Sequence, residues 1–389
     1  MDSPTNHPWL SHLAKLCVLA TFALILIGGM VTTSGAGMAA STAPHVNGTL
    51  VNPSGWFQDP ALRLEHGHRL AAMTVALLTG ILCAGLWRNW LAFVVAIFLM
   101  GLADAIGHPL HLSSALIAQL RIWPAMILFI VLLLAGARRH GRTPGAEQWM
   151  ALVAYVAVGL QALMGTLRVN LETSGDFSAA LNLRTFHGVF AQAFLALMVV
   201  LAARLSPVWR EISQRPSIEA APKIRRMAII ALALYFAQLA CAAYLRHRGL
   251  GLIIPTWPGA QQGGGFIVIA TESSLFAARL GGGLLPAAWN HAIAIHFLHS
   301  RVLPILLTGH ILGMAIVIAK RAYYEPRLTR LGWGLLLLIV VQFALGVMII
   351  WQGRHPHITN THVVTGALIC ATAALLTTRA GRLGHSRGW

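Results

Sequence analysis

The sequence is poor in charge. Only 10% of its 389 residues are charged, and 11 acidic residues stand against 28 basic ones. Hydrophobic residues make up 57% of the chain. An ordinary soluble globule is excluded, because so few polar side chains cannot cover the exterior of a chain of this size. The composition predicts an all-α polytopic membrane protein.

Cysteine is equally scarce. The four cysteines are Cys17, Cys83, Cys241 and Cys370, and each lies inside an apolar run. Because none falls between runs, we expect no disulfide in a loop. The cysteines are interpreted as small apolar residues of the helices.

Long apolar runs are what the chain has in abundance. A helix needs about 20 apolar residues to cross a bilayer, at a rise of about 1.5 Å per residue. Eight runs meet this need: 13–34, 70–87, 146–167, 186–205, 226–245, 302–319, 331–351 and 362–378. Two shorter runs, 90–106 and 112–136, raise the prediction to about ten transmembrane helices. The first run lacks a cleavage site and is interpreted as a span rather than a signal peptide.

The basic residues lie between the runs. They are Arg138, Arg139 and Arg142, the segments 204–226 and 320–330, and Arg379, Arg382 and Arg387. No basic helix is interleaved with aromatic residues, so we expect no nucleic-acid partner. The positive-inside rule places these loops in the cytoplasm. We therefore expect an integral plasma (inner) membrane protein, surrounded by lipid, with both termini cytoplasmic.

The two halves of the chain share a pattern. A glycine pair and a Thr-x-Pro segment recur with the same interval, as Gly35-Ala36-Gly37 with Thr42-Ala43-Pro44 and as Gly249-Leu250-Gly251 with Thr256-Trp257-Pro258. His68 then matches His299, Gln161 with Gly165 matches Gln342 with Gly346, and His187 matches His362. The preserved order predicts a tandem duplication of a four-helix unit.

The halves differ in length. The interval from His68 to Gln161 is 93 residues, whereas His299 to Gln342 is 43. The excess is the length of a helical hairpin that crosses the membrane twice. We expect two pseudo-symmetric four-helix bundles with this hairpin at about 89–137. The expected domains are 1–210, a cytoplasmic linker at 211–223, and 224–389, with a glycine-rich outer loop at about 259–288.

Four histidines occupy the duplicated positions: His68, His187, His299 and His362. On the expected topology all four lie near the outer face. Imidazoles that oppose each other inside a four-helix bundle are a common way to hold haem iron. A single histidine at a membrane edge is more often an interfacial hydrogen-bonding residue. Because a structural role gives no reason for a duplicated pair, we interpret all four as metal ligands.

Glu65 lies three residues before His68, which places both on one face of a helix. A carboxylate near apolar surroundings is costly unless it is paired or functional. It either forms an ion pair with Arg63 or Arg69 or handles protons beside a bound ligand. The matching position in the second half is His296. This asymmetry indicates one reactive site, with Glu65 as the catalytic candidate, and one electron-transfer site.

Two arginines lie at the outer ends of helices. Arg168 and Arg246 are candidates for contacts with haem propionates, since guanidinium groups pair well with carboxylates. The alternative is that both are interfacial anchors.

The motifs together resemble the haem A synthase family. They are Glu65-x-x-His68-Arg69, Gln161 to Val169, His187-Gly188, Arg246 to Gly251 with Trp257-Pro258, Ile295 to His299, and His362. The resemblance covers nearly the whole chain apart from the expected hairpin. One departure is Ser300, which moves Arg301 one residue away from His299 and about 100° around a helix.

The resemblance implies an activity and its cofactors. The family oxidises the C8 methyl of haem O to a formyl group by successive hydroxylations. Carried over to this chain, His299 and His362 bind a haem b, His68 and His187 flank the substrate haem O, and Glu65 is the acidic residue at the reacting centre. Expected partners are a haem O synthase and the assembly of a terminal oxidase. The hairpin is unusual for the family and is interpreted as a surface for a second copy of the chain or another partner.

Two other functions are compatible with the pattern. A non-catalytic di-haem b-type cytochrome that passes electrons from quinol explains the four histidines but gives Glu65 no role. A transporter built on tandem repeats would use the histidines as proton carriers.

Overall fold

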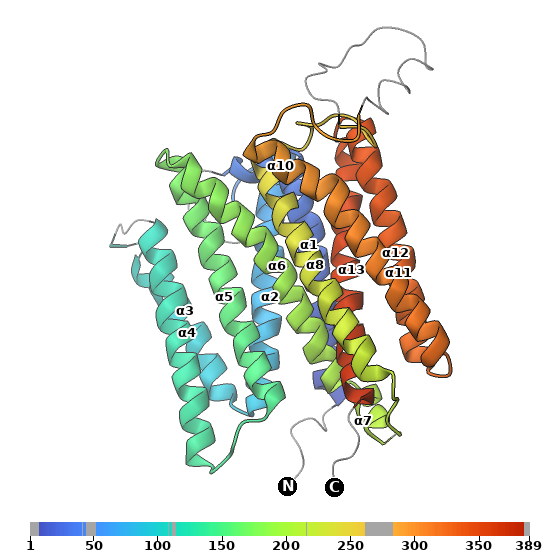
Figure 1. The fold of residues 1–389 in the computed structure, drawn as a ribbon. Coiled ribbons are helices and arrows are strands. Elements are labelled where there is room, and N and C mark those ends of the chain that lie inside the picture. The colour runs from blue at the N-terminus through green and yellow to red at the C-terminus, as the bar shows by residue number, and fades with distance from the viewer. Residues whose placement is uncertain are drawn as a thin grey trace. The chain divides into compact units, whose positions relative to one another are not determined.

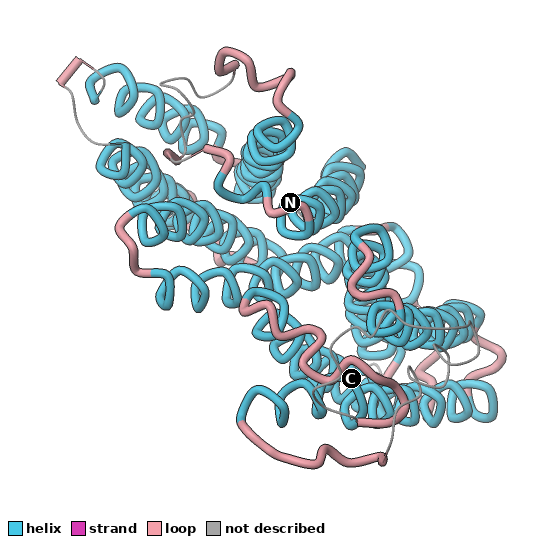
Figure 2. The backbone as a smooth tube through the Cα atoms, turned by 90° about the horizontal axis from the view of Figure 1, so that it is seen from above, coloured by secondary structure: helices cyan, strands magenta, loops and turns pink. Residues whose placement is uncertain are grey.

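The computed structural model describes residues 8–40, 42–43, 52–107, 109–110, 114–214, 216–260 and 283–384. All regular structure in these ranges is helical (Figure 2). Ten helices are long and apolar enough to cross a membrane. The prediction of an all-α protein with about ten such helices is therefore confirmed for the described ranges. The turn at 107–111 is only partly described, and most of the expected outer loop, 261–282, lies outside the described residues.

The chain divides into two compact units, Met1–Gln214 and Arg215–Trp389. The helices of the first unit are α1 (Pro8–Thr33), α2 (Pro60–Trp87), α3 (Trp90–Gly107), α4 (Ser114–Arg139), α5 (Ala146–Thr173), α6 (Phe177–Leu205) and the short α7 (Pro207–Ser213). A 3-10 turn, η2 (Ala36–Met38), follows α1.

Four helices of the first unit form a closed ring. Helix α1 packs against α2 and α6, and α5 packs against the same two. Helices α2 and α6 therefore stand at opposite corners of the ring. The α3–α4 hairpin packs against α2 and α5 from outside, as Figure 1 shows. Its entry and exit are thus on one edge of the bundle.

The second unit has a ring of the same kind. Its helices are α8 (Ala221–His247), α10 (His291–Phe297), the π-helical turn η3 (Leu298–Val302), α11 (Leu303–Arg321), α12 (Pro326–Trp351) and α13 (Pro356–Leu383). Elements α10, η3 and α11 run on as one span. Helix α8 packs against α11 and α13, and α12 packs against the same two, so α11 and α13 are at opposite corners.

Several helices begin before their apolar runs. Asp59 caps α2 by accepting hydrogen bonds from the backbone N–H groups of Ala61 and Leu62, and Asp176 caps α6 in the same way through Ala179. Such caps satisfy backbone donors that the first helical turn leaves free. His68 and His187 consequently lie eight and ten residues inside their helices, rather than at the helix starts that the apolar runs predict.

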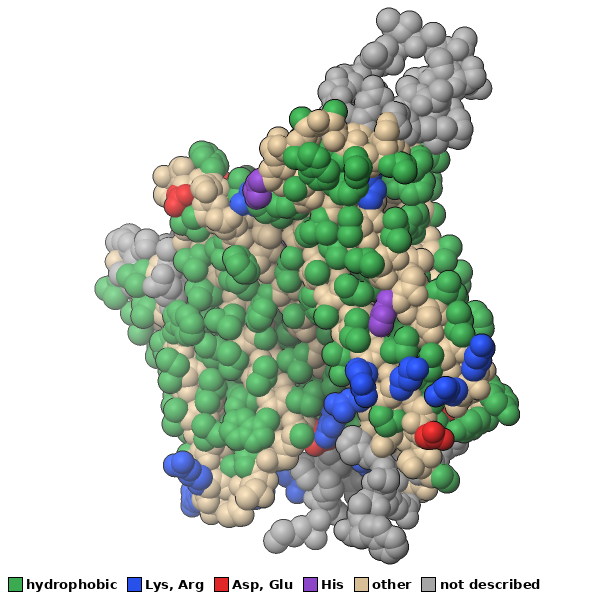
Figure 3. Space-filling model, viewed as in Figure 1, with side chains coloured by type: hydrophobic (Ala, Val, Ile, Leu, Met, Phe, Trp, Pro, Cys, Tyr) green, Lys and Arg blue, Asp and Glu red, His purple; other side chains and the backbone are tan. Residues whose placement is uncertain are grey.

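The side chains that face outward suit a lipid environment. On the face drawn in Figure 3, hydrophobic side chains cover the length of the helices. Lys and Arg gather toward the end where α11 turns into α12. The four cysteines form no disulfide with one another and lie in α1, α2, α8 and α13, inside helices as the sequence predicts.

Close packing of α1 on α2 generates a prediction at Gly85. A Cβ atom there would lie 2.6 Å from the Trp9 ring and 2.9 Å from the Leu10 side chain. We expect Gly85→Ala to lower the free energy of unfolding by about 1–3 kcal/mol, the usual cost of overpacking. Thermal unfolding in detergent measures it. Gly101→Ala in α3 is the control, because a Cβ there meets nothing within 4 Å. Equal stability of the two variants would contradict the close packing.

Candidate functional site

One cavity in the second unit contains two of the predicted ligands. His299 in η3 and His362 in α13 both line it, from opposite corners of the ring. Gln238 and Gln342 line it from the two remaining helices, α8 and α12. The rest of the lining is mainly apolar, so the cavity presents two imidazoles to a largely hydrocarbon interior.

The His299 ring is oriented by α8. Its Nδ1 lies 3.3 Å from the Gln238 carbonyl oxygen, and the Gln238 side-chain amide donates to the His299 carbonyl at 2.8 Å. Histidines that bind metals usually donate one ring N–H to such an acceptor, which leaves the other nitrogen for the metal. Nε2 of His299 is the nitrogen left available.

The His362 ring is held by α12. Its Nε2 lies 3.2 Å from the Gln342 amide nitrogen, while its Nδ1 is buried without a hydrogen-bond partner. Gly346, one turn beyond Gln342, leaves room for the ring, since a Cβ atom there would lie 3.4 Å from its Cε1. A larger residue at this position would compete with the imidazole for space.

Two guanidinium groups line the same cavity. One is Arg246, which the sequence predicts as a propionate contact, and the other is Arg354. Arg354 has a φ of 63°, and its side chain packs against Gly251. Arg354 could not be predicted from the sequence, because it follows α12 in a loop and belongs to no repeated motif.

In the first unit the other two predicted ligands have corresponding places. His68 is in α2 and His187 is in α6, at opposite corners of the ring. A Cβ at Gly28 would lie 2.9 Å from the His68 Cε1, and one at Gly165 would lie 3.8 Å from the His187 Cε1. Gln161 donates to the His187 carbonyl at 3.1 Å. Gln161 and Gly165 thus accompany His187 as Gln342 and Gly346 accompany His362.

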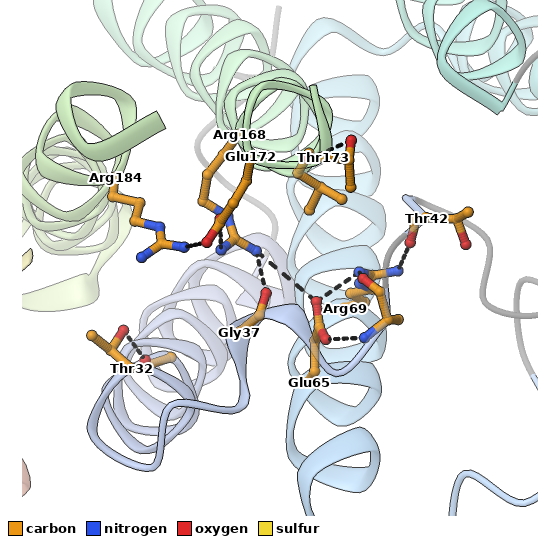
Figure 4. A network of polar contacts seen from close by, with 12 residues as sticks. Thr32, Gly37, Thr42, Glu65, Arg69, Arg168, Glu172, Thr173 and Arg184 are labelled. Carbon is orange, nitrogen blue, oxygen red and sulfur yellow. Dashed lines mark hydrogen bonds and ion pairs between the residues drawn. The ribbon is translucent and has the colours of Figure 1, made fainter. Parts of the chain in front are cut away.

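Glu65 is buried in an ion-pair network (Figure 4). Its Oε1 lies 2.7 Å from the Arg69 guanidinium and 3.9 Å from that of Arg168. Its Oε2 accepts a hydrogen bond from the Ala40 backbone N–H at 2.7 Å. Of the two arginines considered in the sequence, Arg69 forms the pair. Both carboxylate oxygens are fixed, so the group cannot rotate freely.

The network continues toward α6. Arg168 donates to the Gly37 carbonyl at 2.7 Å and lies 3.5 Å from Glu172, which also pairs with Arg184 (Figure 4). Glu172 and Arg184 could not be singled out from the sequence, because they are ordinary charged residues near the ends of their helices. The predicted propionate contact, Arg168, is thus engaged by two carboxylates and a backbone carbonyl.

The matching position in the second unit has different chemistry. His296 is 2% exposed, and its Nε2 lies 3.1 Å from the Gly251 carbonyl oxygen. In the first unit the equivalent glycine carbonyl, that of Gly37, is bound by Arg168. The structure therefore places a carboxylate held by guanidinium groups beside one histidine and an imidazole held by the backbone beside the other.

Comparison with known proteins decides the family. The profile of the COX15-CtaA family, described as cytochrome oxidase assembly protein, matches residues 120–374. The chain belongs to this family. The match extends from α4 to α13 and includes His187, His299 and His362, and it confirms the resemblance seen in the sequence. No curated protein is similar enough to the chain to count as a match.

The COX15-CtaA family implies haem, and the residues present fit it. Nδ1 of His68 and Nδ1 of His362 are buried polar atoms without hydrogen-bond partners. Glycines face the imidazoles where a larger residue would fill the space. Two arginines line the cavity that holds His299 and His362, as a ligand with carboxylate groups requires.

The contact between Gly28 and His68 generates a prediction. In Gly28→Ala the new methyl group displaces the His68 ring, because 2.9 Å is shorter than a carbon–carbon contact allows. We expect the purified variant to lose the haem of the first unit and keep that of the second, measured as haem per protein. Gly165→Ala is the matched control, since its Cβ would lie 3.8 Å from the His187 ring. Full haem content in Gly28→Ala would contradict the assignment of His68.

Proposed function

We propose that this COX15-CtaA member is a haem A synthase, which oxidises the C8 methyl of haem O to a formyl group by successive hydroxylations. The observation that carries the proposal is the asymmetry of the two histidine pairs. One pair has a buried carboxylate three residues from a ligand, and the other has His296 at that position.

The second unit is assigned the haem b. His299 and His362 hold its iron, and Arg246 and Arg354 pair with its propionates. When bound, this haem supplies electron transfer to and from the substrate site. Gln238 and Gln342 orient the two imidazoles through the contacts described above. The mainly apolar lining of the cavity excludes water from the ligand.

The first unit is assigned the substrate, haem O, between His68 and His187. Glu65 would move protons there, and water or dioxygen would supply the formyl oxygen. With water, each hydroxylation releases two electrons, which would pass to the haem b, and two protons, which Glu65 would take up as a general base. With dioxygen, each hydroxylation consumes two electrons from the haem b and two protons, which Glu65 would pass on as water forms. Arg69 and the Ala40 N–H fix its carboxylate, and Arg168 adds a second positive charge nearby. A base held in this way needs no rearrangement before it acts.

The proposal includes the architecture and its setting. The equivalent helix rings support two tandem pseudo-symmetric four-helix bundles, with α3–α4 as the inserted hairpin. The basic segments between spans support a plasma (inner) membrane location with cytoplasmic termini and haem sites near the outer face. A haem O synthase supplies the substrate, and terminal oxidase assembly uses the product. The hairpin offers a surface for a second copy of the chain.

The catalytic role of Glu65 is tested by Glu65→Gln. The amide keeps the size of the side chain but loses its charge, so we expect haem A formation to fall by about 10²–10⁴-fold with haem content intact. Asp176→Asn is the control, because it also removes one carboxylate from the first unit while asparagine remains a good helix cap. Undiminished haem A formation in Glu65→Gln would show that Glu65 is not the base.

Pigment analysis tests the activity itself. The full chain is co-expressed with a haem O synthase, purified, and its haems are extracted and separated. We expect haem O or haem A together with haem B, because the two sites take different haems. Haem B alone would identify a di-haem cytochrome instead, and absence of haem would favour a transporter.

A further inference from the structure

The span that carries His299 contains a π-helical turn. Residues Leu298–Val302 form it, and the Leu303 backbone N–H donates to the Leu298 carbonyl five residues earlier. A π-helical turn of this kind holds one more residue than an α-helical turn, and such turns are often found at functional sites. No such turn is present in α2, which carries the equivalent His68.

The sequence has one extra residue at the same place. In the first unit His68 is followed directly by Arg69, whereas Ser300 separates His299 from Arg301 in the second. In a regular α-helix this insertion would turn Arg301 about 100° away from the position of Arg69. The sequence alone therefore predicts that the two arginines make different contacts.

The structure shows the same contact instead. Arg69 donates to the Thr42 carbonyl at 2.6 Å, and Arg301 donates to the Thr256 carbonyl at 2.6 Å. Thr42 and Thr256 follow their glycine pairs at the same interval. Arg301, which is buried, also donates to the Gly259 carbonyl. The displacement expected for Arg301 is thus cancelled, because the π-helical turn absorbs the extra residue.

Ser300 fills the place between Arg301 and position 296. In the first unit Arg69 pairs directly with Glu65, four residues earlier. In the second, Arg301 donates to the Ser300 hydroxyl at 2.5 Å. That hydroxyl lies 3.3 Å from the His296 Nδ1 and 2.6 Å from the His296 carbonyl oxygen. A neutral hydroxyl therefore joins the arginine to position 296 where the first unit has an ion pair.

Pro304 explains why the turn is stable at this point. Proline has no N–H, so it cannot bond to a carbonyl in the preceding turn. The His299 carbonyl, five residues before Pro304, accepts the Gln238 side-chain amide at 2.8 Å instead. The turn is thus held on one side by α8 and on the other by Arg301.

We propose that Ser300 is an inserted residue absorbed by the π-helical turn, and that Arg301 is the positioning residue that fixes the His299 imidazole in the cavity. It does so by joining the His299 turn to the carbonyl groups of the 256–259 segment. The proposal rests on the proposed function only for the ligand of His299, which is taken to be haem b.

Deletion of Ser300 in the full-length chain tests the insertion. We expect it to convert the turn to an α-helical one, with Arg301 still at the Thr256 carbonyl and haem b content close to that of the parent chain. Deletion of Leu306 is the matched control, because it removes one lipid-facing residue from the α-helical part of the same span. We expect the Leu306 deletion to lose most of its haem b. The α-helical part of the span has no extra residue, so this deletion rotates the segments on its two sides relative to each other. If the two deletion variants retain the same amount of haem b, whether high or low, Ser300 is not an inserted residue that the π-helical turn absorbs.

The role of Arg301 is tested by the low-spin ferric EPR signal of the bound haem b. This signal depends on the orientation of the two imidazoles that would hold the iron. We expect Arg301→Ala to shift this signal and Arg301→Lys, which keeps one cationic donor, to restore part of it. Arg321→Ala, an exposed position at the end of the same helix, should leave the signal unchanged. An unshifted signal in Arg301→Ala, or an equal shift in Arg301→Lys, would overturn the positioning role. Because haem b content and EPR do not require turnover, these results remain interpretable if the chain forms no haem A.

Discussion

A guanidinium group bound to a loop carbonyl is the interaction on which the end of each unit that carries the first histidine depends. Arg69 donates to the Thr42 carbonyl oxygen and Arg301 donates to the Thr256 carbonyl oxygen, each at 2.6 Å. The Arg301 side chain is buried, and a buried arginine must find its acceptors within the chain. Arg69 is partly exposed and bonds to the equivalent carbonyl group. Each arginine therefore ties the loop after the first helix to the helix that carries the first histidine. In both units that bond lies within two residues of the histidine, at Arg69 beside His68 and at Arg301 beside His299.

The same helical scaffold surrounds the two histidine pairs with different polar groups. Both units place histidines at opposite corners of a ring of four helices, and both use glutamine and glycine from a neighbouring helix to hold one of them. They differ beside the other histidine, in the residue at the position of Glu65 and in the inserted Ser300 with its π-helical turn. Glu65 is gripped by guanidinium groups, whereas His296 rests on a backbone carbonyl and a hydroxyl. A buried carboxylate is costly unless it is paired or functional, and Glu65 is paired with Arg69. Under the proposed function Glu65 also handles protons, which would distinguish a reacting site from a site that passes electrons.

Much of this was open to prediction from the sequence, because the relevant signals are local. Apolar runs predict the spans, and the repeated order of residues pairs His187 with His362. The helix starts were missed, since the polar turns capped by Asp59 and Asp176 do not look like membrane segments. Arg354 was missed because its position is set by tertiary packing against Gly251 rather than by spacing. The π-helical turn could not be predicted for another reason. The sequence shows the inserted residue, but it does not show whether the helix beyond it rotates by about 100° or accommodates the residue in a π-helical turn.

The arrangement of the two histidines at opposite corners of the ring has a consequence for folding. In the second unit α11 and α13 each pack against α8 and α12. His299 and His362 therefore reach their facing positions only when all four of these helices have packed together. A haem held by this pair would act as a cross-link between spans that are distant in the sequence, and its binding would raise the stability of the whole ring.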